Sequence, residues 1–231
     1  MHSASPTRTT LASTILVIGI ILIAANLRAP IAGIGPVLDQ MIDSLHLSQS
    51  QAGMLTTLPL LAFAIASPLA TALAKKQGIE ISLFIALIMI ALGLFSRIID
   101  STFMLYISTA IVGIGIAIGN VLLPSLIKRD FPHKIAVMTS AYVLAMGIFA
   151  GSYSAIIIPL ANYQDLGWKI ALASYGIVTI ISIVVWLPQL RLRTKPNKVI
   201  TATKSQEKYG IIVCLGISLF SWGLIHFFPM S

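Results

Sequence analysis

The sequence predicts an all-α, polytopic membrane helix bundle. Of its 231 residues, 57% are hydrophobic and only 10% are charged, whereas roughly a quarter of the residues of an average soluble domain are charged. The mean hydropathy is +0.96. The uncharged runs are long, and about 20 apolar helical residues suffice to cross the hydrocarbon layer of a bilayer. A membrane β-barrel would require alternating segments of about ten residues. The sequence lacks them, so helices are the expected form.

Charged residues mark where each membrane-spanning segment ends, because a charge in mid-membrane is costly. We expect a six-span unit over residues 1–190, a basic linker over 191–208 and a seventh hydrophobic segment over 209–231. A cleavable signal peptide is the alternative for the first segment, but this run is long for one and more hydrophobic sequence follows it. The expected spans are 9–38, 47–74, 81–99, 102–127, 135–164, 170–190 and 209–228.

The distribution of Lys and Arg predicts the orientation of the bundle. One set of alternate connections carries twelve basic residues, whereas the other carries only Arg97 and Lys169. Because basic loops are retained in the cytoplasm, we expect a cytoplasmic N-terminus. The net charge of +8 then reflects loops at an anionic membrane surface, so no nucleic-acid partner is expected. The twelve are Arg8, Lys75, Lys76, Lys128, Arg129, Lys134, Arg191, Arg193, Lys195, Lys198, Lys204 and Lys208.

Spans 1 and 4 both contain residues that interrupt helices. Carriers built from inverted repeats place interrupted helices at their solute site, so the paired interruption predicts a solute cavity beside these two spans. The alternative is that small residues permit close helix packing, and both interpretations remain open. The residues are Pro30, Gly33, Gly35 and Pro36 in span 1, and Gly113, Gly115, Gly119 and Pro124 in span 4.

Four stretches carry a family resemblance: NLRAPIAGIGPVLDQM from Asn26, LSQSQAGMLTTLPLLAFAIASPLA from Leu47, GIGIAIGNVLLPSLIKRDFP from Gly113 with the following Met138-Thr139, and GWKIALA from Gly167. Through them, residues 11–189 resemble the cyanate and nitroimidazole transporter branch of the major facilitator superfamily. The most specific piece is GNVLLPSLIKRDFP, which begins at Gly119. The resemblance implies a bacterial inner-membrane secondary transporter with twelve spans in its complete form. The first six spans would be its N-terminal half, built from two inverted three-helix repeats. Past about Ser205 we find no family pattern, and we expect a tail altered by a frameshift or a premature stop.

The connection between spans 2 and 3 departs from the usual pattern of the superfamily, in which an acidic residue precedes a basic one and a glycine. Lys75 stands at the usual acidic position and Glu80 at a usual basic one. Two interpretations are open. The residues form an inter-helix charge lock of reversed polarity that gates the carrier, or the loop is basic only because it sets topology.

Arg28 carries the most chemical information, because it lies inside span 1 and no carboxylate lies inside the six spans. An intramembrane cation without an acidic partner requires a water-filled cavity, backbone carbonyls or an anionic ligand, and the guanidinium fork suits carboxylate-like or linear anions. Arg28 therefore either binds solute or hydrogen-bonds nearby backbone carbonyls, which Pro30 loosens because it lacks an amide donor. The neighbouring amide of Asn26 either bridges helices or binds solute.

Helical spacing adds candidates on spans 4 and 5. Asn120 lies on a stripe of small residues in span 4, which favours a place at the solute cavity. In span 5, Tyr142 and Tyr153 share one face, while Gly147 and Gly151 share roughly the opposite one. The aromatic face predicts contact with a small planar solute, or else helix packing. The glycine face predicts close packing against a partner helix.

The sequence contains no enzyme constellation, no metal-spaced Cys or His cluster and no phosphate-binding loop. We therefore expect no catalytic residue, no cofactor and no metal site. Two classes of function remain. The first is a carrier of small anionic or weakly acidic organic solutes, expected to be inactive as this chain alone. The second is a non-transporting membrane fragment or a half-transporter subunit. The expected partners are the lipid bilayer, a small-molecule solute, and a second copy or a complementing C-terminal half.

Overall fold

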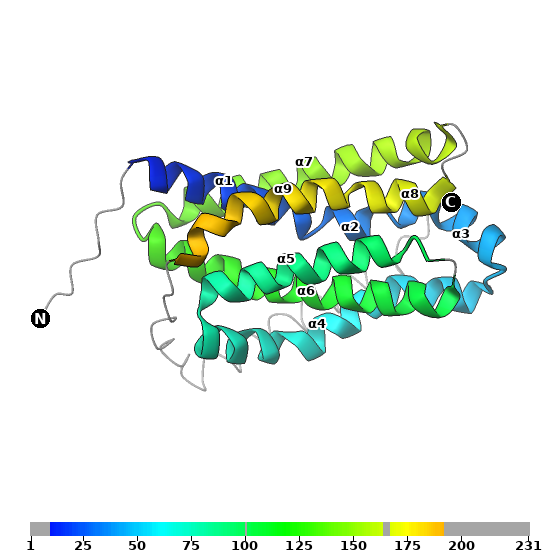
Figure 1. Ribbon diagram of the computed structural model, residues 1–231, viewed down its shortest axis with the longest axis horizontal. Coiled ribbons are helices and arrows are strands. Elements are labelled where there is room, and N and C mark those ends of the chain that lie inside the picture. Colours follow the sequence, from blue (N-terminus) through cyan, green and yellow to red (C-terminus); the bar gives the residue numbers. More distant parts are fainter. Residues whose placement is uncertain (1–9, 100, 164–166, 192–231) are drawn as a thin grey trace, which may run out of the picture. The chain divides into compact units, whose positions relative to one another are not determined.

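The computed structural model describes residues 10–99, 101–163 and 167–191, all within one compact unit, residues 1–195. Figure 1 shows their helices. The expected linker beyond Arg191 and the seventh segment lie outside the described residues. The elements are α1 (Thr10–Asn26), α2 (Ala29–Ala32), the 3-10 helix η1 (Gly35–Val37), α3 (Leu38–Leu45), α4 (Gln49–Gln77), α5 (Ile79–Ser96), α6 (Thr102–Asp130), α7 (Ile135–Asn162), α8 (Gly167–Ser174), α9 (Gly176–Trp186) and the 3-10 helix η3 (Leu187–Arg191).

Six helical segments in the described part of the chain are long and apolar enough to cross a membrane, and no strand occurs there. The all-α fold class is thereby confirmed. The observed boundaries follow the expected ones closely, because turn and cap residues lie where the uncharged runs end. Before α4, for example, Ser48 and Gln51 form a reciprocal capping box, in which each side chain accepts a hydrogen bond from the other residue's amide.

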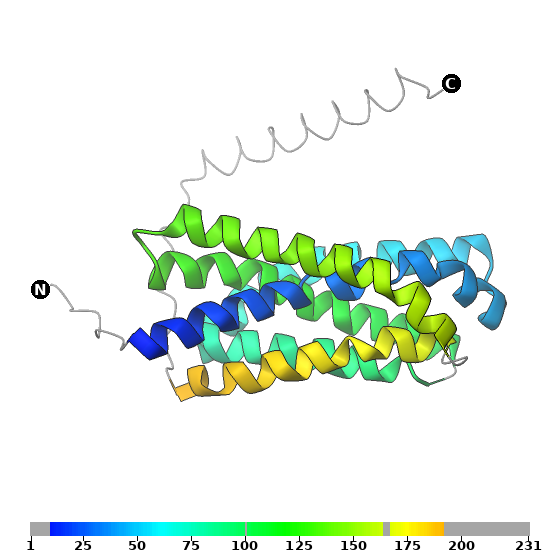
Figure 2. The same cartoon turned by 90° about the horizontal axis from the view of Figure 1, so that it is seen from above.

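The six spans gather into two groups of three. In Figure 1, α4, α5 and α6 form the lower group, whereas span 1, α7 and the α8–α9 span form the upper one. Figure 2 shows α1 running between α7 and α9. Spans 1–3 therefore do not pack as a block of their own. Span 1 packs with spans 5 and 6, and span 4 packs with spans 2 and 3.

Glycines set the close approach of α5 and α6. A Cβ atom placed on Gly115 would lie 2.8 Å from the backbone oxygen of Ala86, and one on Gly93 would lie 2.9 Å from that of Ser108. Such distances are shorter than real Cβ contacts, so only glycine lets the two backbones come this near. The main chains of α5 and α6 are therefore in direct contact.

Span 1 is broken, but span 4 is not. Span 1 is helical in pieces, with a turn at Leu27 and Arg28 and a second one at Gly33 and Ile34, before the η1 turn. In contrast, α6 runs without a break through its three glycines and Pro124. The expectation of paired interruptions was therefore wrong for span 4, because a helix buried on several sides tolerates Pro and Gly that a lone helix would not.

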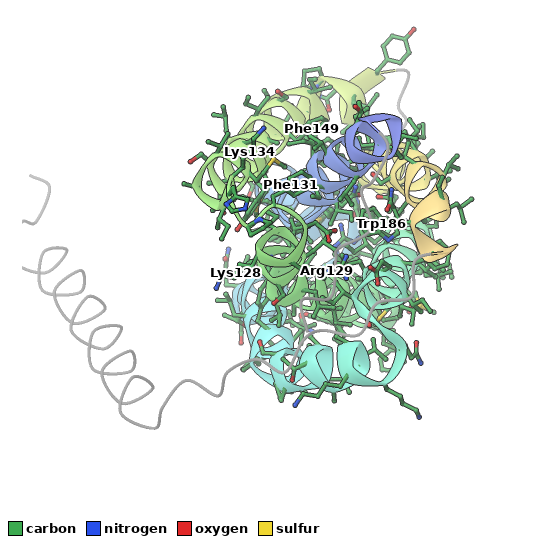
Figure 3. All side chains as sticks on the ribbon, turned by 90° about the vertical axis from the view of Figure 1, so that its left-hand side faces the viewer. Lys128, Arg129, Phe131, Lys134, Phe149 and Trp186 are labelled. Atoms are coloured by element: carbon green, nitrogen blue, oxygen red, sulfur yellow. The ribbon has the colours of Figure 1, made fainter. Side chains whose placement is uncertain are left out.

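A charged cluster joins α5 and α6 at the end of the bundle that carries Lys128 and Lys134, viewed in Figure 3. The Arg129 guanidinium forms a 2.8 Å ion pair with Glu80 and a two-point contact, at 2.8 and 2.9 Å, with Asp130. The Trp186 indole donates a 3.0 Å hydrogen bond to the Glu80 backbone oxygen. The structure therefore gives Glu80 a partner on a different helix, Arg129, whereas Lys75 is exposed.

Candidate functional site

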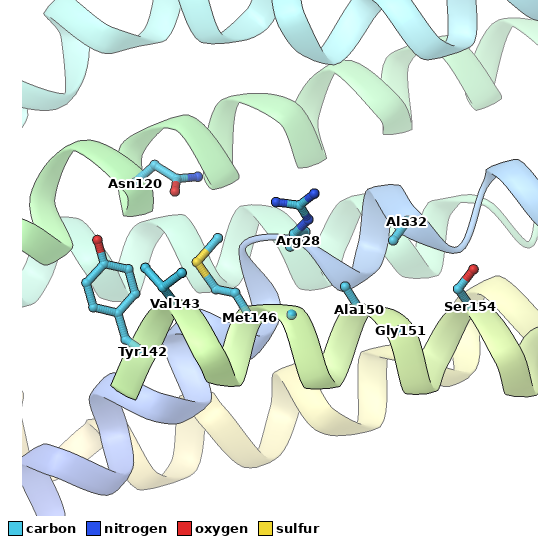
Figure 4. A pocket seen from close by; sticks show the side chains of 10 residues that line it. Arg28, Ala32, Asn120, Tyr142, Val143, Met146, Ala150, Gly151 and Ser154 are labelled. Atoms are coloured by element: carbon cyan, nitrogen blue, oxygen red, sulfur yellow. The ribbon is translucent and has the colours of Figure 1, made fainter. Parts of the chain in front are cut away.

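A cavity of about 720 Å³ lies beside the break in span 1, and Figure 4 shows its lining. A second cavity of about 440 Å³ shares Arg28, Ala32, Asn120 and Met146 with it. The walls come from the broken segment of span 1, from α6 and from one face of α7, with Phe63 of α4 on the second cavity. The α7 residues on the larger cavity are Tyr142, Val143, Met146, Gly147, Ala150, Gly151 and Ser154.

Arg28 is the charged residue of this cavity. It lies in the turn between α1 and α2, with backbone angles of φ −130° and ψ −42°, and its side chain is exposed. Figure 4 shows its guanidinium projecting into the space between α6 and α7. It has no hydrogen-bond or ion-pair partner among the described residues, and no Asp or Glu lines either cavity. Five N–H donors are therefore available to an anion at this point.

Asn120 supplies the second polar group. Its amide nitrogen donates a 3.0 Å hydrogen bond to the backbone oxygen of Ile116, one turn earlier in α6. This bond fixes the amide on its own helix and leaves the side-chain oxygen to face the cavity with acceptor capacity. A guanidinium donor and an amide acceptor thus share one cavity with apolar side chains such as Val143 and Met146, and a few polar groups among apolar ones are typical of a small-molecule site.

The cavity-facing side of α7 lies between the two faces that the sequence distinguished. Tyr142 is at one edge, and Gly147 and Gly151 are at the other. A Cβ atom on either glycine would meet nothing within 4 Å, so these two residues open the cavity in this part of the chain and do not pack against a described helix.

Tyr153 does not line the cavity. Its side chain is buried, and its hydroxyl donates hydrogen bonds to the backbone oxygens of Ala171 (2.8 Å) and Leu172 (3.2 Å) in α8. Its ring lies against Gly33 so closely that an added Cβ atom at that position would clash with it. Helical spacing placed Tyr153 on the face of Tyr142, but that face turns toward α8 at this level of the bundle.

Asn26 lies at the interface of α1 and α9 and is fully buried. Its amide nitrogen donates to the Ser182 hydroxyl (2.7 Å) and to the Leu22 backbone oxygen (2.8 Å), and its amide oxygen accepts from the Thr179 hydroxyl (2.6 Å). The amide therefore bridges two helices and faces away from the cavity, whose linings do not include it.

Two residues that sequence reasoning did not select also meet the break in span 1. The Arg97 guanidinium donates a 3.4 Å hydrogen bond to the Pro30 backbone oxygen, and the Tyr175 hydroxyl donates a 3.0 Å bond to that of Ala25. The charge pattern placed Arg97 in a loop, whereas its side chain is only 1% exposed. One signal was available: the run ending at Ser96 is the shortest of the six, which brings the next residue into the bundle.

The comparisons with known proteins agree with this architecture. A family model described as Major Facilitator Superfamily matches residues 12–230, so the expectation that the family pattern ends near Ser205 was wrong. The chain is 46% identical over 183 residues to the 2-nitroimidazole transporter of Escherichia coli (strain K12), covering 79% of this chain and 46% of that protein. It is 27% identical over 168 residues to the cyanate transport protein CynX of the same strain, covering 72% and 44%.

A solved structure supports the same fold. The crystal structure of the peptide transporter POT in complex with sulfate has a TM-score of 0.66 to this chain at 13% identity, over 96% of this chain and 48% of that one. The match to part of a larger carrier agrees with the sequence coverage, because the chain spans about half the length of the curated relatives it matches.

Proposed function

Because the chain belongs to the Major Facilitator Superfamily, we propose that it forms the solute-binding wall of a secondary transporter for small anionic or weakly acidic organic solutes. The observation that carries this proposal is the exposed guanidinium of Arg28, which has no protein partner among the described residues and lies in a cavity without an acidic side chain. A cation in such a place is compensated by water or by an anion.

The chemistry of the cavity defines the solute class. The planar guanidinium fork binds carboxylate-like and linear anions through paired N–H donors. The Asn120 amide oxygen accepts a hydrogen bond from a solute that carries its own N–H or O–H group. The relatives named as transporters of 2-nitroimidazole and of cyanate support small solutes. We take cyanate and 2-nitroimidazole as the two probe solutes.

In this proposal, transport follows from the placement of the cavity beside a broken helix. Carriers of this type expose a central site first to one side of the membrane and then to the other, by rocking of one helical unit against another. We propose a multi-pass protein of the bacterial inner membrane with its N-terminus in the cytoplasm, in agreement with the basic residues Lys75, Lys76, Lys128 and Lys134 at one end of the bundle. No enzymatic step is part of this function.

Binding to the purified chain in lipid nanodiscs tests the proposal. A charge-assisted hydrogen bond contributes about 1.5–3 kcal/mol, so Arg28→Ala is expected to weaken binding of a probe solute about 10- to 100-fold. Arg28→Lys, which keeps the charge but loses the planar fork, should have an affinity between those of Arg28→Ala and the unsubstituted chain. Lys76→Ala removes a positive charge outside the cavity and serves as the control. Equal affinity in Arg28→Ala and the unsubstituted chain would remove Arg28 from the site.

A second proposal concerns the opposite wall of the cavity. The open positions at Gly147 and Gly151 support a subunit that assembles with a complementing C-terminal half, and we propose that this chain alone does not perform alternating access. Liposomes containing the chain alone and the chain with such a half provide the comparison. Saturable, competable exchange of a probe solute by the chain alone, as a single copy or a dimer, would overturn this second proposal.

A further inference from the structure

The break in span 1 leaves the Pro30 carbonyl without the amide donor that a regular helix would give it. The Ile34 amide donates to the Ile31 backbone oxygen (3.1 Å) in a tight turn, so it does not take the Pro30 oxygen as it would in a regular α-helix. On the other side of the turn, the Leu27 amide donates to the Ala24 oxygen (3.0 Å), again across three residues. Buried carbonyls without donors are costly in a membrane, so the break needs donors from elsewhere.

Two side chains from other spans donate hydrogen bonds to carbonyls on the two sides of this turn. The Arg97 guanidinium, which follows α5, reaches the Pro30 oxygen at 3.4 Å, and the Tyr175 hydroxyl, between α8 and α9, reaches the Ala25 oxygen at 3.0 Å. These carbonyls lie two residues after Arg28 and three residues before it. The turn that presents Arg28 to the cavity is therefore held on both sides by hydrogen bonds from outside span 1.

Arg97 occupies its place at a considerable cost. Its Nε and Nη2 atoms have no hydrogen-bond partner in the described part of the chain, although the side chain is fully buried. A guanidinium group is not deprotonated in proteins, so the buried side chain keeps its charge. Its position at the C-terminal end of α5 partly offsets the cost, because the helix dipole there is negative. A residue retained under such conditions is expected to have a specific task.

We propose that Arg97 and Tyr175 are positioning residues of the solute site. Their hydrogen bonds to the backbone stabilise the non-helical turn in span 1 and thereby keep the Arg28 guanidinium in the cavity. This inference rests on the proposed function in one respect only, the part of Arg28 in binding solute. The Tyr153 ring, packed directly on Gly33, holds the second turn of the same segment from the α7 side.

The first test reads the position of the broken segment without any solute. Ala32, which lines both cavities, is replaced by cysteine in a Cys214→Ser background, and its rate of labelling by N-ethylmaleimide is measured in nanodiscs. Arg97→Met and Tyr175→Phe are each expected to change this rate by about twofold or more. Lys169→Gln removes a positive charge at the same end of the bundle and should leave it unchanged. An unaltered rate in both Arg97→Met and Tyr175→Phe would overturn the inference.

The second test is a double-mutant cycle on the affinity for cyanate. Arg97→Met is expected to weaken binding about tenfold in the unsubstituted chain and to have little further effect in Arg28→Ala, because Arg97 acts through Arg28. Arg97→Lys, which keeps a cationic donor, should restore part of the affinity. Equal losses in both backgrounds would show that Arg97 does not position Arg28.

The two tests separate the inference from the function it rests on. If Arg28→Ala binds cyanate normally while Arg97→Met still alters Ala32→Cys labelling, the proposed function fails and the positioning of span 1 stands. If Arg97→Met does not accumulate in the membrane, both the labelling rate and the affinity for cyanate are measured on Tyr175→Phe, which removes only one oxygen atom. No effect of Tyr175→Phe on labelling or affinity would then overturn the inference.

Discussion

Replacing Asn26 by leucine is expected to weaken the contact between α1 and α9 by an amount that the structure allows us to calculate. The substitution removes two hydrogen bonds between helices, with Ser182 at 2.7 Å and with Thr179 at 2.6 Å. Such bonds contribute about 0.6 kcal/mol each on average in a membrane protein and about 1.7 kcal/mol at most. Twice these values is about 1.2 and about 3.4 kcal/mol.

The lower value is the expected one, because both hydroxyl groups still have an acceptor for their hydrogen atom when Asn26 is removed. The Ser182 hydroxyl donates to the Val178 backbone oxygen at 2.7 Å, and the Thr179 hydroxyl has the Tyr175 backbone oxygen at 3.3 Å. Asn26→Leu therefore leaves no buried hydroxyl without a partner, and the penalty for an unsatisfied group does not arise. Leucine also refills the space, so a cavity contributes little.

Unfolding of the purified chain by sodium dodecyl sulfate in mixed micelles, followed by tryptophan fluorescence, measures the change in free energy. Asn120→Leu is the matched control, because the Asn120 amide bonds only within its own helix in the part of the chain that the structure describes. This substitution should lower the free energy of unfolding much less. The reasoning would be refuted by a loss under about 0.3 kcal/mol for Asn26→Leu. A second result would also refute it. If Asn26→Leu lowers the free energy of unfolding by the same amount in a Thr179→Val, Ser182→Ala background as in the unsubstituted chain, its effect does not depend on these two partners, whereas coupled residues are not additive.

Three further predictions follow from the helix packing and the charge pattern. Gly115→Ala should lower the free energy of unfolding by about 1–3 kcal/mol through overpacking against α5, whereas Gly147→Ala, where a Cβ meets nothing within 4 Å, should have no effect in the same titration. Glu80→Gln should lower the free energy of unfolding by only about 1 kcal/mol, because Arg129 keeps Asp130 as a partner. If this decrease is no larger than the one caused by substituting an exposed lysine, the ion pair does not stabilise the fold. In whole cells, an impermeant thiol reagent should label Asp43→Cys but not Lys76→Cys. The reverse pattern would show that the chain has the opposite orientation in the membrane.

Much of the fold was predictable from the sequence, because the length of an uncharged run and the position of the next charge fix where a membrane helix begins and ends. The observed α4 and α7 differ from the expected 47–74 and 135–164 by only a few residues. The break in span 1 was also foreseen from Pro30 and Gly33. The packing neighbour of each span was not predictable in this way, since it depends on contacts between distant parts of the chain.

The site was predictable only in part, for reasons that particular residues make clear. The place of Arg28 at the cavity was predictable, because a charge inside an apolar run is costly in a membrane and needs such a space. Tyr153 was placed on the wrong side, because a helical wheel gives the angle between two side chains but not the direction in which a helix turns them within the bundle. One interpretation of the sequence made Arg28 the donor to backbone carbonyls near Pro30. In the structure, the side chains that donate to carbonyls near the turn are Arg97 and Tyr175, which lie 69 and 147 residues further along the chain.

The two glycines that leave α7 open toward the cavity have an evolutionary consequence. Most positions that surround a binding space also support the fold, so a change of side chain there alters stability and selectivity together. At Gly147 and Gly151 these two effects are separate, because an added side chain would enter empty space. Each glycine codon reaches alanine by a single nucleotide change. Descendants of this chain can therefore narrow the cavity by small steps without first acquiring a compensating mutation elsewhere. Under the proposed function, each such step would change the size of the accepted solute.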